Sequence, residues 1–168
     1  MDGYHGDCCG TAVLPIGTEA TAEEKNAYEN AVKLKNVAST TLQTGIEAIQ
    51  VGKPFTVIGD EIENFLKRNH PGYSICTKFC GHGIGKYFHQ APQVPHWSSK
   101  TAYVNPNAKK LVEPGMIFTI EPAIIEGTNA SVSIGKDGWT ANSTMGFRSA
   151  QAEHTLLVHN DHVEVLTG

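Results

Sequence analysis

The sequence lacks the features that mark several large classes of protein. No apolar run reaches the length of about 18 residues that a membrane-spanning helix needs, and no charged and apolar leader opens the chain. The 13 Lys and Arg residues are outnumbered by 17 Asp and Glu residues, so the net charge is −4 and no basic surface for nucleic acid is expected. We therefore expect a cytoplasmic protein without membrane partners and without direct nucleic-acid binding.

Cysteine is also scarce, with four residues at Cys8, Cys9, Cys76 and Cys80. A secreted disulfide scaffold of this size would be richer in cysteine. A structural zinc site remains an alternative, but neither the adjacent pair nor the pair four residues apart has the spacing of a zinc finger. We expect four reduced thiols.

The composition and the helical signals indicate one domain over residues 1–168. Forty per cent of the residues are hydrophobic, which is enough for a sizeable core. Thr21 and Glu24 have the spacing of a capping box, and apolar residues at helical spacing follow, so a helix is expected over residues 22–50. Thr56 is expected to cap a second helix over residues 57–69.

The rest of the chain favours strands. Residues 73–79, 116–121, 150–158 and 163–166 carry the alternating or apolar patterns of β-strands, whereas residues 90–114 are rich in Pro, Ser and Asn and are expected to form an irregular connection. This order predicts an α+β domain in which two helices pack on an antiparallel sheet.

Four residues suit a metal site of carboxylate and imidazole ligands: Asp7, His82, Glu121 and Glu153. His82 lies between glycines that let backbone or ligand approach closely. A carboxylate inside an apolar strand, as at Glu153, costs several kcal/mol if it is buried without a partner. Taken singly, each residue also fits an ordinary role, as a solvent-facing glutamate, a turn histidine or a turn aspartate.

Five motifs in order give the sequence a resemblance to a known family. The chain resembles the type I methionine aminopeptidases over essentially all of its length, with fitting separations between the motifs. They are Asp2-Gly-Tyr-His-Gly-Asp7, Cys80-Gly-His-Gly-Ile-Gly85 with Phe88-His89, Phe118-Thr-Ile-Glu-Pro122, Asp137-Gly-Trp139 and Ser149-Ala-Gln-Ala-Glu-His-Thr155.

The resemblance implies a pita-bread (creatinase/aminopeptidase) fold around two divalent ions, with Co, Mn, Fe or Zn all suited to such ligands. It implies an enzyme that removes the initiator methionine from nascent proteins. The expected partners of this enzyme are peptides that start with Met and the ribosome, and the expected oligomeric state is a monomer. The implied metal ligands are Asp7, His82, Glu121 and Glu153. Glu121 would also move the catalytic proton, His89 would bind the substrate amide, and Phe88 and Trp139 would line the methionine pocket.

The remaining histidines receive weaker assignments. His96 and Trp97 are expected at the rim of the site without a chemical role, and His5 and His154 are expected to be structural.

One ligand of the family is not matched. The second aspartate of the family's motif would fall ahead of Met1, and Asp2 is no substitute, because residues 2 and 7 of a regular strand point to opposite faces. We therefore expect the N-terminal part of the catalytic domain to be missing, one well-liganded ion, and little activity for this chain alone. A fragment of a longer enzyme is favoured over a shortened homologue. The alternative function is a non-catalytic pita-bread module that binds peptides or proteins, although such a module would be expected to lose the ligands.

Overall fold

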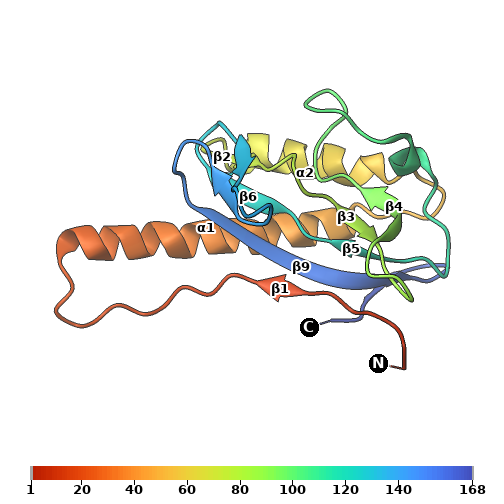
Figure 1. Cartoon of the computed structure of the whole chain (residues 1–168), viewed down its shortest axis with the longest axis horizontal. Coiled ribbons are helices and arrows are strands. Elements are labelled where there is room, and N and C mark those ends of the chain that lie inside the picture. Colours follow the sequence, from red (N-terminus) through yellow and green to blue (C-terminus); the bar gives the residue numbers. More distant parts are fainter. Residues whose placement is uncertain (1, 168) are drawn as a thin grey trace.

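The computed structural model describes residues 2–167, which form a mixed helix and sheet structure (Figure 1). The elements follow one another as β1 (Cys9–Gly10), α1 (Ala22–Glu47), α2 (Thr56–Asn69), β2 (Tyr73–Ile75), β3 (Gly81–Gly83), β4 (Gln90–Val94), the short 3-10 helix η1 (Pro106–Lys109), β5 (Ile117–Ile120), β6 (Ala123–Glu126), β7 (Val132–Ile134), β8 (Ala141–Ser143), β9 (Ser149–Val158) and β10 (Val163–Val165).

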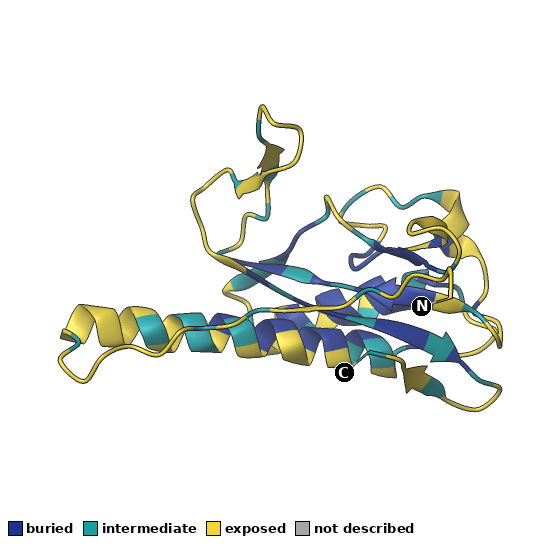
Figure 2. Cartoon of the chain, turned by 60° about the horizontal axis from the view of Figure 1, so that its bottom comes forward, coloured by how far each residue is buried: buried dark blue, intermediate teal, exposed yellow. Residues whose placement is uncertain are grey.

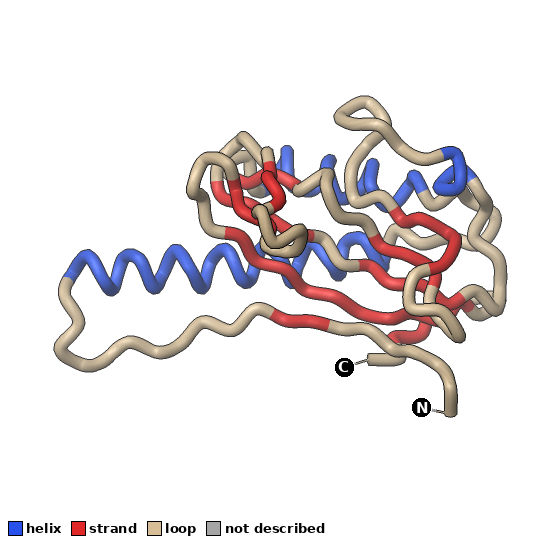
Figure 3. Tube along the Cα trace, viewed as in Figure 1, coloured by secondary structure: helices blue, strands red, loops and turns tan. Residues whose placement is uncertain are grey.

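The main sheet is antiparallel and is organised around the long strand β9. Its order is β2-β6-β9-β5-β3-β4, and both β1 and β10 also pair with β9. Figure 3 shows β9 as the longest strand, with β1 running beside it. β7 and β8 form a separate hairpin. The sheet therefore brings residues from both ends of the chain to one central strand.

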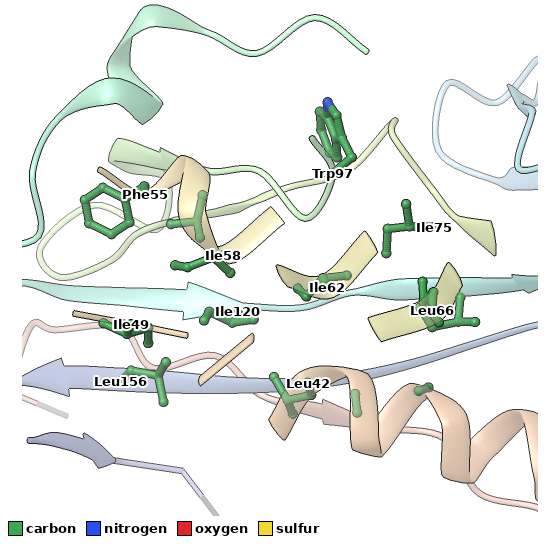
Figure 4. Packing of buried hydrophobic residues seen from close by; sticks show 14 of the residues in the cluster. Leu42, Ile49, Phe55, Ile58, Ile62, Leu66, Ile75, Trp97, Ile120 and Leu156 are labelled. Carbon is green, nitrogen blue, oxygen red and sulfur yellow. The ribbon is translucent and has the colours of Figure 1, made fainter. Parts of the chain in front are cut away.

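The two helices pack against one face of this sheet. The buried core joins Leu42 of α1 and Ile58 and Ile62 of α2 to Ile120 of β5 and Leu156 of β9 (Figure 4). Because side chains alternate along a strand, residues an odd number of positions from Ile120 and Leu156 face away from the helices. They include the candidate ligand Glu121, one position after Ile120, and Thr155 and Glu153, one and three positions before Leu156.

Helix α1 begins as the sequence predicts but packs over only part of its length. Thr21 and Glu24 form the capping box, with Thr21 Oγ1 accepting from the Glu24 N–H and Glu24 Oε2 accepting from the Thr21 N–H. Its buried residues all lie between Leu34 and Gly45. The first turns are mostly exposed and extend beyond the sheet (Figure 2).

The predicted start of the second helix is wrong in detail. Thr56 is the first residue of α2, and Phe55 occupies the N-cap without a capping side chain. Phe55 is fully buried, and its N–H donates to the Lys110 carbonyl, so core packing sets this helix end.

Several expected strand boundaries also change. The expected strand over 73–79 shortens to β2, and the expected irregular connection over 90–114 contains β4 and η1. β4 pairs with β3, so tertiary pairing overrides the weak local signal of a segment that contains proline. Strands β6, β7 and β8 were not predicted.

Two further expectations concern the cysteines and membrane-spanning helices. The four cysteines are free thiols. No helix within residues 2–167 has the length and hydropathy to cross a membrane.

Candidate metal centre

His82 lies in β3 between two glycines that no other residue could replace without a clash. A Cβ at Gly81 would overlap the Thr119 carbonyl oxygen, and one at Gly83 would overlap the Ala91 carbonyl oxygen. The neighbouring strands therefore approach His82 closely from both sides, which accounts for the glycine-rich motif.

The contacts of His82 determine which ring nitrogen is free to bind a ligand. Nδ1 lies 3.1 Å from the Gly83 carbonyl oxygen. A carbonyl only accepts, so this contact places a proton on Nδ1, and in the neutral imidazole the lone pair is then on Nε2. Nε2 lies 3.6 Å from Glu121 Oε1 and 3.9 Å from Asp7 Oδ2. The neutral tautomer that this contact selects is the one that directs an acceptor nitrogen toward the two carboxylates, as a metal ligand requires.

Glu121 follows β5 and is held by neutral polar groups. Thr119 Oγ1 donates to Glu121 Oε1 at 3.0 Å and accepts from the His82 N–H at 3.1 Å. Gln151 Nε2 donates to the Glu121 carbonyl at 3.0 Å and lies 3.4 Å from its Oε2. The Glu121 N–H donates to His96 Nε2 at 3.2 Å. These contacts fix both the main chain and the carboxylate of Glu121.

Glu153 and Asp7 are brought together by the pairing of the first residues with β9. Cys9 lies opposite Glu153 in the β1–β9 ladder. The main chain of Asp7 is held by Thr155, whose Oγ1 accepts from the Asp7 N–H at 3.0 Å and donates to the Asp7 carbonyl at 2.7 Å. Glu153 is only 5% exposed, and its Oε1 is buried without a hydrogen-bond partner within residues 2–167.

Burial and mutual repulsion disfavour the charged forms of Glu121 and Glu153 in the metal-free chain. Burial, followed by the nearby charges of Glu121 and Asp7, raises the pKa of Glu153 to about 7. Burial, with Asp7 adding repulsion, also raises the pKa of Glu121 to about 7 despite the bonds from Thr119 and Gln151. The structure shows no Lys or Arg paired with these three carboxylates among the described residues. A cation placed among them would relieve the repulsion.

His89 and Phe88 lie beside this group. The His89 ring is 4.3 Å from the His82 ring, centroid to centroid, and Phe88 contacts both histidines edge-on or tilted. His5 packs edge-on against Phe88 at 5.5 Å, so its role is to support this aromatic group. Trp139 is different, because it is 89% exposed in the loop that joins β7 to β8. Its expected place in a methionine pocket stays a prediction.

The expectation that His96 and Trp97 lie at the rim is wrong. His96 is fully buried and Trp97 is 7% exposed. Burial lowers the pKa of His96 to about 3, so its imidazole is neutral and Nε2 can accept the Glu121 N–H. Thr119 and Gln151 were also missed, although each lies two residues from a candidate ligand on the same strand face.

The donor set fits a divalent cation, although its atoms do not yet surround one position. No group of three or more His, Cys, Asp or Glu side chains in the described part of the chain has the arrangement of a formed metal site. The fit rests on the Glu153 oxygen that has no hydrogen-bond partner within residues 2–167, on Nε2 of His82, and on three carboxylates that pair with no Lys or Arg in that same part of the chain. Imidazole with carboxylate oxygens is the chemistry that borderline and hard divalent ions select.

Comparisons with known proteins find related metallopeptidases. A model described as metallopeptidase family M24 matches residues 1–160. The chain is 42% identical over 167 residues to methionine aminopeptidase A of Synechocystis, covering 99% of this chain and 58% of that protein. It is 39% identical over 167 residues to the mitochondrial methionine aminopeptidase 1D of Danio rerio, covering 99% of this chain and 44% of that protein. The chain thus spans about half the length of the curated relatives it matches.

Solved structures give the same likeness in three dimensions. The chain aligns with a methionine aminopeptidase from Thermotoga maritima at a TM-score of 0.80 and 27% identity, over 99% of this chain and 59% of that one. A prolidase from Pyrococcus furiosus aligns at a TM-score of 0.63 and 16% identity, over 99% of this chain and 38% of that one, which shows the fold alone. The predicted pita-bread fold is confirmed.

Proposed function

Because the chain belongs to metallopeptidase family M24, we propose that it binds a divalent metal ion through Asp7, His82, Glu121 and Glu153 and acts in removing the N-terminal methionine of peptides. The observation that carries the proposal is the approach of Asp7 and Glu121 to Nε2 of His82, together with the buried Glu153, whose pKa the charges of these two carboxylates help to raise. The names of the relatives, which are methionine aminopeptidases, support the reaction and the substrate.

The four side chains would hold the ion, and the surrounding residues would keep them in place. A divalent ion in such a site supplies Lewis acidity toward water and toward a peptide carbonyl. Thr119, Gln151 and Thr155 orient the ligands through the hydrogen bonds described above. Such supporting contacts tune a metal site nearly as strongly as the ligands themselves.

The remaining roles follow from position and protonation. Glu121, with a raised pKa near neutrality, takes up or releases a proton at its carboxylate, as a general base and acid must. His89, beside His82 and exposed to the cleft, donates or accepts a hydrogen bond at the substrate amide. Phe88 offers an apolar surface to the methionine side chain. The expected role of Trp139 in this pocket is kept as part of the proposal, although only its exposed position is known.

Four protein ligands suffice for one ion, so we propose one tightly held ion per chain and slow turnover by the chain alone. Titration of the EDTA-treated chain with Mn²⁺ by isothermal calorimetry should give a stoichiometry near one. Methionine release from a Met-Gly peptide, followed by mass spectrometry, should require the metal. Glu153→Ala should abolish both, and the exposed-site control Glu113→Ala should change neither.

Two outcomes would contradict the proposal. Two tightly bound ions with rapid turnover would refute the one-ion site. Metal-independent binding of the peptide, unchanged in Glu153→Ala and without methionine release, would instead favour a peptide-binding module.

A further inference from the structure

A cleft lined by His82 and Glu121, two of the four proposed ligands, extends beyond the candidate site. Its volume is about 510 Å³, within the range of about 300–1,000 Å³ that small-ligand sites occupy. His82, His89 and Glu121 contribute part of its lining. The rest comes from the segment before β3, from β4 and from the segment around η1: Lys78, Phe79, Cys80, Gln90, Ala91, Gln93, Asn105 and Asn107.

The charge of this lining is uneven. Glu121 is its only acidic residue among the described ones, and it belongs to the proposed metal site. Lys78 is the only Lys or Arg that lines the cleft in the part of the chain that the structure describes. Lys67 and Arg148, by contrast, pair with Glu63 and Glu126 elsewhere on the surface. Lys78 is exposed and forms no ion pair within residues 2–167, so its charge is available to a ligand.

Carboxamides complete the lining near Lys78. The side chains of Gln90, Gln93 and Asn107 form no hydrogen bond with any described residue, whereas Asn105 Oδ1 already accepts from the Asn107 N–H. A carboxamide can both donate and accept, which suits the alternating N–H and C=O groups of an extended peptide. The cleft therefore offers carboxamides that suit a peptide main chain and one lysine ammonium group.

We propose that this part of the cleft receives the substrate residues that follow the first peptide bond, and that Lys78 favours a carboxylate there. The inference rests on the proposed function and adds a preference among substrates. The carboxylate can come from an acidic side chain or from the C-terminus of a short peptide. An unpaired cation at the edge of a cleft attracts anions and is screened by salt.

Three peptides distinguish a side-chain carboxylate from a C-terminal carboxylate as the group that Lys78 favours. They are Met-Gly-Gln amide, which has no carboxylate, Met-Gly-Glu amide, which has a side-chain carboxylate, and Met-Gly-Gln free acid, which has a terminal one. Their dissociation constants are measured calorimetrically with the Mn²⁺-supplemented chain, within the period in which mass spectrometry shows each peptide still uncleaved, which the slow turnover proposed above allows. At least one carboxylate-bearing peptide should bind about two- to five-fold more tightly than the neutral amide, the range for an exposed ion pair. The one that does identifies the source.

Two lysine variants test the role of Lys78. Lys78→Met should abolish the preference and leave the affinity for the neutral amide unchanged. Lys86→Met, which removes an exposed lysine of a different cleft, should retain the preference. The preference in the unmodified chain should shrink in 0.5 M NaCl.

The outcomes distinguish this inference from the function on which it rests. Equal binding of all three peptides, or a preference that survives Lys78→Met, overturns the role of Lys78 and leaves the proposed function standing. Failure of all three peptides to bind overturns the proposed function, and the inference with it.

Discussion

Replacing Glu153 by glutamine should stabilise the metal-free chain at alkaline pH, although the residue is buried. The pKa of Glu153 is raised from 4.5 to about 7 by burial and by Glu121 and Asp7. A carboxyl whose pKa rises on folding binds more protons in the folded state, so stability is lost as pH increases from about 4.5 to about 7. Glutamine has nearly the same shape and no charge, and therefore removes this loss.

The size of the gain follows from the pKa. One pKa unit corresponds to about 1.4 kcal/mol, so the rise to about 7 gives roughly 3 kcal/mol as an upper limit at pH 8. Solvent and the movement of neighbouring side chains reduce this figure, and we expect about 1–3 kcal/mol. For a chain of this size each kcal/mol raises the melting temperature by about 2–4 °C.

Thermal and urea unfolding in EDTA, followed by circular dichroism at pH 5 and pH 8, test this expectation. Glu153→Gln should be more stable than the unmodified chain at pH 8, with a much smaller difference at pH 5. Glu113→Gln, at an exposed position, is the matched control. Added Mn²⁺ should stabilise the unmodified chain and not Glu153→Gln. A variant that is less stable at pH 8, or equally stabilised at both pH values, would refute the reasoning.

Three further variants examine the support of the site. His96→Ala should lower the unfolding free energy by about 2–4 kcal/mol in urea denaturation, because it leaves a cavity and an unpaired Glu121 N–H. Thr119→Val should keep the fold, by circular dichroism, but weaken Mn²⁺ binding about 10- to 100-fold by calorimetry; unchanged affinity would exclude its supporting role. Gly83→Ala should be destabilised by about 1–3 kcal/mol or more in the same denaturation assay, because its Cβ overlaps the Ala91 carbonyl.

Local signals were enough to predict α1 and the long strand β9. The capping box of α1 depends on residues three apart, and the apolar run of β9 is continuous in the sequence. β4 and the start of α2 were not predicted correctly, because pairing with β3 and burial of Phe55 decide them.

In the candidate site, too, some features could be predicted from the sequence and others depend on tertiary packing. Asp7 and Glu153 were singled out from residue type and resemblance, and the structure brings them together. The burial of His96 was not predicted, because its short segment contains proline and shows no helix or strand period, and only the packed structure shows that its imidazole reaches the Glu121 main chain. Whether the four predicted ligands bind metal stays a prediction.

The pairing of the first residues with β9 also constrains when the site can form during synthesis. Asp7 is fixed by Thr155, 148 residues later, so these contacts have nearly the largest sequence separation available in the chain. Contacts of such separation pay a large loop-closure entropy and slow folding. During translation, α1 and α2 leave the ribosome long before β9 does. The two helices can therefore begin to pack before Thr155 is available to bind the main chain of Asp7. A metal ion that binds the nascent chain before Glu153 emerges would lack one of the four proposed ligands.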